Sequence, residues 1–317
     1  MSENDNPVKI VNLRKEYHGF VSVNDLNLDI KKNSFTGLLG PNGAGKSTTL
    51  KILTHLINAT SGNAYINGID VTEDPKAALK GVGTVIETPE FYPYLTPRET
   101  MRYIGEIIGM NRETITYQTD SILEKVHMTD WADKKMGTFS KGMKQRVAIG
   151  QSLIDDPSLI VLDEPTSGLD PRGMAEMRDI LKNLRNDMNG LTVMMSSHMM
   201  YEVQDLCDRV AIINHGTLVL HDDISAITAE KGVRNLVIKT KDLPTDEIAN
   251  TIGSLPYVVS SDKIGTEIHI RYNIDDGQTS DLFTQLGNLN IGVCEMREGD
   301  NLEARFLDLT KDSEDVL

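Results

Sequence analysis

The sequence is poor in aromatic residues and in cysteine, and it lacks a long uncharged run that is uniformly hydrophobic. Aromatic side chains make up 5% of its 317 residues, so the core must consist largely of aliphatic side chains and methionine. The two cysteines, Cys207 and Cys294, form no CxxC pair, which excludes a disulfide framework or zinc site and favours a reducing cytoplasm. Polar residues interrupt the longest uncharged stretch, residues 52–69, so no membrane span is expected.

Basic side chains are also in the minority: 32 Lys and Arg stand against 47 Asp and Glu, which gives a net charge of -15. Nucleic-acid binding needs cationic side chains that neutralise phosphates, so no nucleic-acid partner is expected. Residues 222–317 hold 9 basic and 19 acidic side chains, so most of the excess lies there. The length favours two domains, and this break in charge predicts them at 1–222 and 223–317.

Hydrophobic periodicity predicts an α/β fold for the first domain. Apolar residues alternate at 8–13 and 26–30, as in half-buried strands of an antiparallel layer. Residues 159–162 and 192–195 are typical of buried parallel strands, with an amphipathic crossover helix between them. Residues 96–155 are expected to be mainly helical. Four methionines near the second parallel strand are expected to fill the core: Met194, Met195, Met199 and Met200.

Residues 236–306 show a different order of elements, which predicts a second domain of the α+β class. The order is strand, helix, two strands, helix and strand, a ferredoxin-like pattern. Such domains serve many functions, so the fold names no ligand for residues 223–317. One hypothesis makes this domain a ligand-sensing or interaction module that regulates the first domain.

A glycine-rich loop precedes a predicted helix that runs from Lys46 to about Leu56. The loop sequence GPNGAGKS fits GxxxxGK[ST] in full. Glycines let consecutive backbone N–H groups turn toward phosphate oxygens, and the helix N-terminus adds partial positive charge. In this interpretation Lys46 reaches the β- and γ-phosphates and Ser47 binds magnesium. The residues expected to touch the nucleotide here are Gly40, Pro41, Asn42, Gly43, Ala44, Gly45, Lys46, Ser47 and Thr48.

Two acidic residues, Asp163 and Glu164, follow the buried strand at 159–162. The strand places Asp163 near the magnesium, and Glu164 is then positioned to orient and deprotonate an attacking water. This arrangement predicts hydrolysis rather than phosphoryl transfer to a substrate. The absence of an NKxD guanine-reading motif argues against a GTPase.

Together these motifs resemble the nucleotide-binding subunits of ABC transporters over about residues 8–222. The segment FSKGMKQR, residues 139–146, resembles the ABC signature, although the family pattern LSGGQ is altered at three positions. The resemblance implies a P-loop NTPase fold with an antiparallel β subdomain and a helical subdomain, and ATP with Mg2+ as cofactors. It also implies that Ser140 and Gly142 face the γ-phosphate of ATP bound to a second copy of the subunit.

The same resemblance assigns roles to three further residues. Asp170 in the segment SGLD resembles a residue of the D-loop, which communicates across the dimer. His198 resembles the switch histidine that contacts the γ-phosphate and supports Glu164. Tyr17 stands where the family has an aromatic residue that stacks on adenine. The resemblance thus implies Glu164, His198 and Lys46 as catalytic residues.

Glu87 stands 41 residues after Lys46, where the family has a glutamine near the magnesium and the membrane partner. A carboxylate oxygen can still bind a hard cation, so the expected magnesium ligands are Ser47, Glu87 and Asp163. Glu87 and the altered signature are similar to the bacitracin-resistance and lantibiotic-immunity group of exporters. In the plainer interpretation, Glu87 is a tolerated replacement in some other exporter.

The resemblance also implies partners: a second copy of the chain, arranged head to tail around two ATP molecules, and a separate membrane permease. The chain would then lie at the inner face of the membrane, held there by the permease. Efflux of a peptide antibiotic or drug is one hypothesis for its task. A soluble ABC ATPase that acts on ribosomes or DNA is the alternative.

Overall fold

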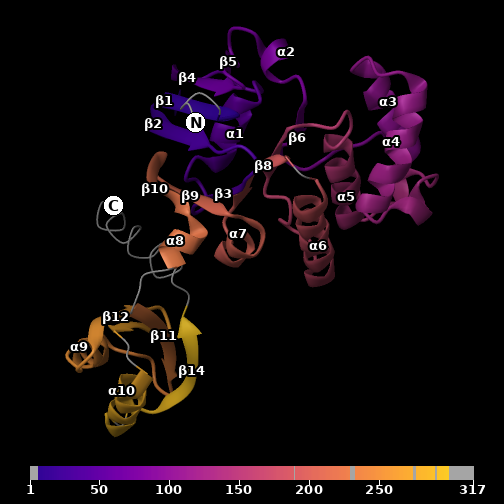
Figure 1. Cartoon of the computed structure of the whole chain (residues 1–317). Coiled ribbons are helices and arrows are strands. Elements are labelled where there is room, and N and C mark those ends of the chain that lie inside the picture. Colours follow the sequence, from indigo (N-terminus) through magenta and orange to yellow (C-terminus); the bar gives the residue numbers. More distant parts are fainter. Residues whose placement is uncertain (1–5, 189, 229–232, 274–275, 290, 300–317) are drawn as a thin grey trace. The chain divides into compact units, whose positions relative to one another are not determined.

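In the computed structural model the chain forms two compact units, Met1–Asp222 and Asp223–Leu317 (Figure 1). None of the helices in the described part of the chain is long and apolar enough to cross a membrane. The structure describes residues 6–188, 190–228, 233–273, 276–289 and 291–299.

The first unit contains two sheets. A four-stranded sheet has the order β2-β1-β4-β5, and a six-stranded sheet has the order β10-β9-β3-β8-β7-β6. In the second sheet β9, β3, β8, β7 and β6 run parallel. The bounds are β1 (Val8–Tyr17), β2 (Phe20–Ile30), β3 (Phe35–Leu39), β4 (Ser61–Ile66), β5 (Ile69–Asp70), β6 (Val82–Val85), β7 (Leu159–Asp163), β8 (Thr192–Ser197), β9 (Arg209–Asn214) and β10 (Thr217–Asp223).

The main core of this unit lies between its two sheets and around helix α1 (Lys46–Leu53), which contacts β2, β4 and β7. Every residue of β7 is buried, as expected for a parallel strand covered on both faces. Helix α7 (Met200–Leu206) packs on β3 so closely that a Cβ at Gly37 would lie 2.5 Å from a methyl group of Val203. Figure 1 shows α1 above and α7 below β3 and β9.

The helices between β6 and β7 form a group of their own in Figure 1. Helix α3 begins with the capping box that its sequence predicts: Thr96 Oγ1 accepts from the Glu99 N–H at 3.2 Å, and Glu99 Oε2 accepts from the Thr96 N–H at 2.9 Å. The remaining helices of the first unit, with the short α8 that follows it, are α2 (Pro75–Ala78), α3 (Pro97–Ile107), α4 (Arg112–Lys125), α5 (Lys141–Ser152), α6 (Pro171–Asp187) and α8 (Ile224–Thr228).

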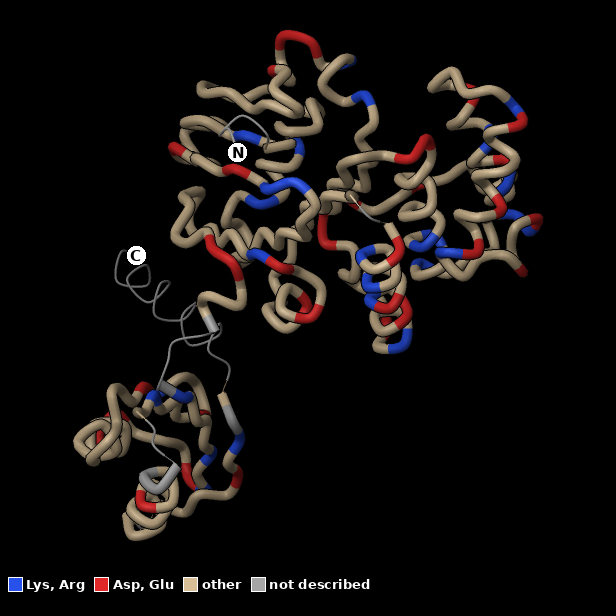
Figure 2. Tube along the Cα trace, viewed as in Figure 1, with Lys and Arg blue, Asp and Glu red and all other residues tan. Residues whose placement is uncertain are grey.

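Charges of both signs are interspersed along α3, α4 and α6 of the first unit (Figure 2). Helix α6 is an example, since Arg172 donates to Glu176 at 3.0 Å one turn later. Such pairs are typical of a solvated helix face.

The second unit contains a four-stranded antiparallel sheet of order β12-β13-β11-β14, against which α9 and α10 pack. Leu236 and Ile238 of β11 pack with Ile268 and Ile270 of β13 against the helices. The predicted ferredoxin-like order is confirmed. The bounds are β11 (Val233–Thr240), α9 (Asp246–Gly253), β12 (Val258–Ile264), β13 (Glu267–Asn273), α10 (Asp276–Asn288) and β14 (Val293–Gly299).

Two expectations for the first unit were wrong in detail, and one helix was missed. Helix α1 ends at Leu53, where the backbone turns, rather than near Leu56. Helix α7 was not expected, because its buried face includes the charged Glu202 and its start has no side-chain cap. Met199 and Met200 begin this helix half-buried, so they are not core residues, whereas Met194 and Met195 are fully buried in β8.

Candidate functional site

The candidate site lies where four parallel strands end. Strand register pairs Leu39 with Ser197, Asp163 with Ser196, and Val85 with Leu162. Parallel strands present their carboxyl ends at one edge of the sheet, so the segments after β3, β6, β7 and β8 meet there. This edge brings together the loop before α1, the acidic pair and the predicted switch histidine.

The loop between β3 and α1 depends on glycine at particular positions. A Cβ at Gly40 would lie 2.3 Å from the Ile213 carbonyl oxygen, so no side chain fits there. Gly43 and Gly45 have φ angles of 82° and 100°, a region that L side chains rarely adopt. The loop can therefore turn its N–H groups inward ahead of the N-terminus of α1, as a phosphate site requires.

Lys46 is buried beneath this loop. Its side chain is 5% exposed, and its Nζ donates to the carbonyl oxygens of Gly40 at 2.8 Å and Pro41 at 3.1 Å. Nζ also lies 3.7 Å from Glu164 Oε1. Burial lowers the pKa of Lys46, and the negative charge of Glu164 partly opposes that effect. A buried ammonium group held at the loop is suited to phosphate oxygens.

Ser47 and Asp163 meet as the sequence predicts. Ser47 Oγ donates to Asp163 Oδ1 at 3.0 Å, and Ser196 Oγ donates to the same oxygen at 2.6 Å. A hydroxyl beside a carboxylate is an oxygen donor set that fits magnesium, which is typically bound by one or two protein groups together with substrate phosphates. The described residues hold no cluster of three or more His, Cys, Asp and Glu, and this donor set needs none.

Glu164 and His198 also come together, although 34 positions separate them. His198 Nδ1 lies 3.0 Å from Glu164 Oε2, and the two side chains are 38% and 23% exposed. The Glu164 backbone has a φ of 44°, and its N–H donates to Ser196 Oγ at 2.9 Å. A carboxylate held by an imidazole at the sheet edge is suited to accept a proton from water.

Two predicted contact residues have other partners in the structure. Thr48 Oγ1 lies 2.9 Å from Ser22 Oγ of β2, a hydrogen bond in which either can donate. Tyr17 ends β1 and is 41% exposed, and Lys15 Nζ lies 4.9 Å from its ring centroid. An exposed ring at this position has room to stack on a base.

Glu87 lies near the same edge, two residues beyond β6, with a φ of 66°. Its carboxylate is 64% exposed and forms an ion pair with Lys51. Lys51 lies one turn after Ser47 on α1, and the hydrogen bond to Glu87 raises its pKa. The structure therefore pairs Glu87 with a lysine that sequence reasoning did not single out.

The predicted signature and D-loop residues begin two neighbouring helices. Ser140 Oγ caps α5 by accepting from the Met143 N–H at 3.3 Å, and Asp170 Oδ1 caps α6 by accepting from the Gly173 N–H at 3.0 Å. A Cβ on Gly168 would meet Lys141 Nζ at 2.3 Å, so the lysine lies over the turn before α6. Gly142 follows Lys141 in the first turn of α5.

Sequence reasoning missed three buried residues that support the site. Ser196 holds Asp163 and the Glu164 N–H, and the run of two serines before His198 was the only signal for it. Thr166 and Glu202 hydrogen-bond to each other at 2.5 Å. Nothing in the sequence pointed to this pair, because 36 positions separate its members.

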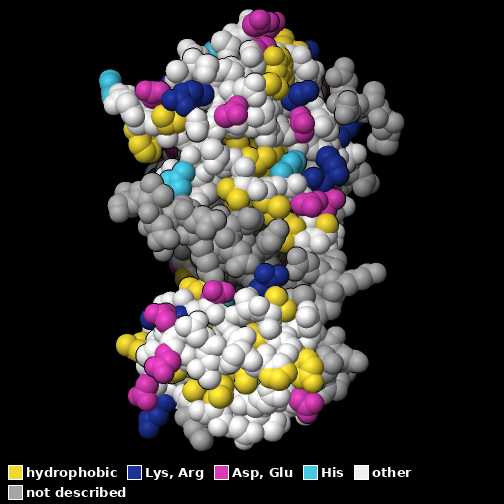
Figure 3. Space-filling model, turned by 90° about the vertical axis from the view of Figure 1, so that its left-hand side faces the viewer, with side chains coloured by type: hydrophobic (Ala, Val, Ile, Leu, Met, Phe, Trp, Pro, Cys, Tyr) yellow, Lys and Arg dark blue, Asp and Glu magenta, His cyan; other side chains and the backbone are white. Residues whose placement is uncertain are grey.

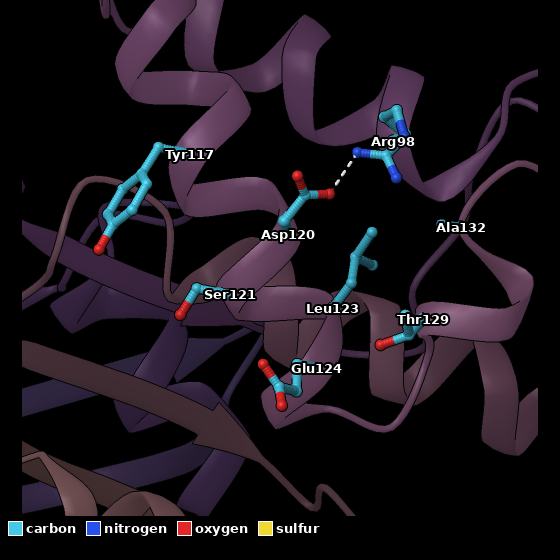
Figure 4. A pocket seen from close by; sticks show the side chains of 8 residues that line it. All are labelled: Arg98, Tyr117, Asp120, Ser121, Leu123, Glu124, Thr129 and Ala132. Carbon is cyan, nitrogen blue, oxygen red and sulfur yellow. Dashed lines mark hydrogen bonds and ion pairs between the residues drawn. The ribbon is translucent and has the colours of Figure 1, made fainter.

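A hollow on the helical group is a different kind of surface. Figure 4 shows it between α3, α4 and the turn that carries Thr129. Arg98 donates to Asp120 at 2.6 Å and to Asp133 at 3.0 Å. Two carboxylates neutralise the guanidinium, so this hollow has no free cation for a phosphate.

Comparison with known proteins agrees with this geometry. The family model "ABC transporter" matches residues 23–167. The bacitracin transport ATP-binding protein BcrA of Bacillus licheniformis is 40% identical over 212 residues, which are 67% of this chain and 68% of BcrA. The linearmycin resistance ATP-binding protein LnrL of Bacillus subtilis is 32% identical over 305 residues, which are 94% of this chain and 96% of LnrL.

A solved structure shares the fold of the first unit. It is the dimeric structure of the ATP-binding cassette MJ0796 in a post-hydrolysis state with ADP and Pi, with a TM-score of 0.60 and 27% identity over 68% of this chain and 98% of that chain. The resemblance to ABC subunits is thereby confirmed. This chain belongs to the ATP-binding subunits of ABC transporters, and it is a nucleotide-binding ATPase.

Proposed function

We propose that this chain is the ATP-hydrolysing subunit of an exporter, with the nucleotide on the loop 40–48 and the chemistry at Glu164. The observation that carries the proposal is the convergence of two pairs of neighbouring residues at one sheet edge. Ser47 Oγ lies 3.0 Å from Asp163 Oδ1, and Lys46 Nζ lies 3.7 Å from Glu164 Oε1. Tyr17 would stack on the adenine ring.

In this proposal Glu164 accepts a proton from water while the water oxygen attacks the γ-phosphorus. The bond from the γ-phosphorus to the bridging oxygen breaks, and ADP leaves with the electron pair. His198 holds the Glu164 carboxylate in place, and Lys46 stabilises the phosphate charge. Ser47 and Asp163, with Glu87 once it separates from Lys51, would hold magnesium, which supplies further neutralisation of phosphate oxygens.

Two copies would share each nucleotide. Ser140 and Gly142 open α5, and the N-terminus of a helix favours an anion. A head-to-tail arrangement about a two-fold axis would bring these residues to the γ-phosphate held by the other copy, and Asp170 close to the same contact. The dimer of MJ0796 with ADP and Pi supports this proposal by likeness.

A groove beside the Glu87 loop supports a contact with a membrane permease. Leu79, Val85, Ile86 and Phe91 line the groove, and Glu90 and Gln151 are among its polar lining residues. Just beyond it Tyr92 lies exposed against Tyr94 and Tyr103, with ring centroids 5.5 and 6.1 Å apart. Exposed aromatic side chains next to a groove lined in part by apolar residues are typical of protein interfaces.

The names of the relatives give the proposed cargo its class. BcrA is named for bacitracin transport and LnrL for linearmycin resistance, so we propose efflux of an antibiotic. The chain would then act at the inner face of the cell membrane. The second unit, Asp223–Leu317, would be an accessory domain that regulates the ATPase.

Co-purification tests the proposal directly. Tagged Glu164→Gln protein, trapped with ATP in gently solubilised membranes, is expected to bring down one or two integral membrane proteins. A matched sample with ADP in place of ATP controls for capture unrelated to the nucleotide state. Recovery of ribosomes or soluble proteins instead would overturn the transport role and favour a soluble ABC ATPase.

A further inference from the structure

Glu202 is a buried acid without an assigned role. It lies on α7, its exposed fraction is 1%, and the same helix face buries Val203 and Leu206. Both carboxylate oxygens accept a hydrogen bond from a hydroxyl group: Oε1 from Thr166 at 2.5 Å and Oε2 from Ser197 at 2.8 Å. Burying a carboxylate costs free energy unless it is well paired. The two hydroxyl groups therefore compensate the cost of burying Glu202.

The two hydroxyl groups belong to two different turns of the candidate site. Thr166 lies in the turn after β7, which the Ser167 N–H closes on the Glu164 carbonyl oxygen at 3.0 Å. Ser197 ends β8, and its Oγ accepts from the Met199 N–H at 2.9 Å, which closes the turn around His198. Glu202 is therefore bound to the turn that carries Glu164 and to the turn that carries His198.

These contacts form a second bridge between the two turns. The first is the Glu164–His198 contact of 3.0 Å, which is partly exposed. The second is fully buried, because Thr166, Ser197 and Glu202 are each at most 2% exposed. A carboxylate accepts only, and O–H···O⁻ bonds at these lengths are strong, so the buried bridge restrains the separation of the turns beyond the strand ends that Ser196 already joins.

We infer that Glu202 is a positioning residue for hydrolysis: it holds Thr166 and Ser197 together and so sets the approach of His198 to Glu164. Glu202 does not itself touch the nucleotide or the reacting water. The inference rests on the proposed roles of Glu164 and His198. It assigns α7 a function in hydrolysis beyond its packing on β3.

Removal of single hydroxyl groups tests the inference with little change of shape. Thr166→Val and Ser197→Ala are each expected to lower kcat for ATP hydrolysis about 10-fold and to leave KM for ATP within about 2-fold, because the loop 40–48 is untouched. Glu202→Gln keeps the shape but loses one acceptor, and it should lower kcat at least as much. Thr119→Val is the matched control, because Thr119 is also 1% exposed but donates to Ile115 within α4.

A double-mutant cycle distinguishes positioning from a general loss of stability. In a His198→Ala background, Ser197→Ala should lower single-turnover hydrolysis by less than about 2-fold, because the group that it positions is already absent. An equal loss in both backgrounds would overturn the inference. The inference would also be overturned if kcat fell only in step with a fall in Tm. The same holds if Thr119→Val lowered kcat equally.

The design also separates this inference from the roles on which it rests. Wild-type hydrolysis in both Glu164→Gln and His198→Ala would overturn the proposed hydrolytic pair, and the inference with it. Loss of hydrolysis in those two variants, with wild-type kcat in Thr166→Val, Ser197→Ala and Glu202→Gln, would overturn the role of Glu202 alone.

Discussion

Two groups of polar side chains, one in each unit of this chain, differ in how deeply they are buried. In the first unit, polar residues are buried at the carboxyl edge of a parallel sheet: Asp163, Ser196 and Ser197 are at most 8% exposed. In the second unit, Lys239 links Glu267 at 3.3 Å and Glu295 at 3.0 Å across one face of an antiparallel sheet. These three side chains are 19–50% exposed.

The difference follows from strand direction. Parallel strands end together, so residues far apart in sequence meet at one edge and bury each other there. Antiparallel neighbours end at opposite edges, so the charges of the second unit spread over a face. Figure 3 shows hydrophobic side chains in a band across the visible face of that unit. Leu243 and Val259 are among the exposed hydrophobic residues of the unit. We therefore expect substitutions in the polar cluster at the sheet edge of the first unit to affect chemistry, and substitutions in the Lys239 cluster of the second unit to affect mainly stability.

Glu164→Gln is expected to have the largest effect. The amide keeps the size of the side chain but cannot accept the proton, so hydrolysis should fall about 10²- to 10⁴-fold while ATP binding persists. Single-turnover hydrolysis and equilibrium ATP binding measure the two effects separately. Near-wild-type turnover would show that Glu164 is not the proton acceptor. The expected difference between the two units would then lose its main support.

The Lys51–Glu87 pair should have an intermediate effect, because it lies at the site but is partly exposed. Lys51 competes with a cation for the Glu87 carboxylate, so Lys51→Met should lower the free magnesium needed for half-maximal ATP binding about 3- to 10-fold. Isothermal titration at several magnesium concentrations measures this. Adding Glu87→Gln to Lys51→Met is the control, and it should reverse the change; an unchanged magnesium requirement would show that Glu87 does not face the ion.

Glu267→Gln in the second unit should have the smallest effect. Burial of this carboxyl raises its pKa, but Lys239 and Arg297 outweigh burial and hold the pKa below its ordinary value. The ionised group therefore adds stability at neutral pH, and this contribution disappears as pH falls through the lowered pKa. The partners Lys239 and Arg297 are about half-exposed, so water screens the pairing. The free energy of unfolding at pH 7 should therefore fall by less than about 1 kcal/mol in Glu267→Gln.

Hydrogen exchange of the β11 and β13 amides would measure that loss. The difference between wild type and Glu267→Gln should shrink as pH falls through the lowered pKa of Glu267, and ATP hydrolysis should stay unchanged. A large fall in hydrolysis would contradict the division of roles between the two units and would tie the second unit to the chemistry.

The local parts of the candidate site were predictable. The loop 40–47 is a contiguous motif, and its glycines allow positive φ angles and close backbone approach. Glu164 directly follows Asp163 at the end of a buried strand. The capping box at Thr96 and Glu99 was equally readable, because its two hydrogen bonds span three residues. Tyr17 and His198 came from the family resemblance, and their contacts with nucleotide stay predictions.

The missed parts depend on contacts between distant segments. Glu202 in a short, uncapped helix gives no periodic signal, and its partners lie 36 and 5 positions away. Sequence reasoning did not single out Lys51, which the structure pairs with Glu87. Local patterns carry no information about which polar side chain will meet a given hydroxyl across the core.

The sequence by itself determined the ATPase family, the phosphate loop, the acidic pair and the order of elements in the second unit. A contiguous motif or a periodic pattern of apolar residues predicts each of these features. Only the tertiary structure decided that Glu202 joins the turns of Glu164 and His198, and that Lys51 holds Glu87. The physical reason is that a buried or paired charge is stabilised by whichever groups the folded chain brings within hydrogen-bonding distance.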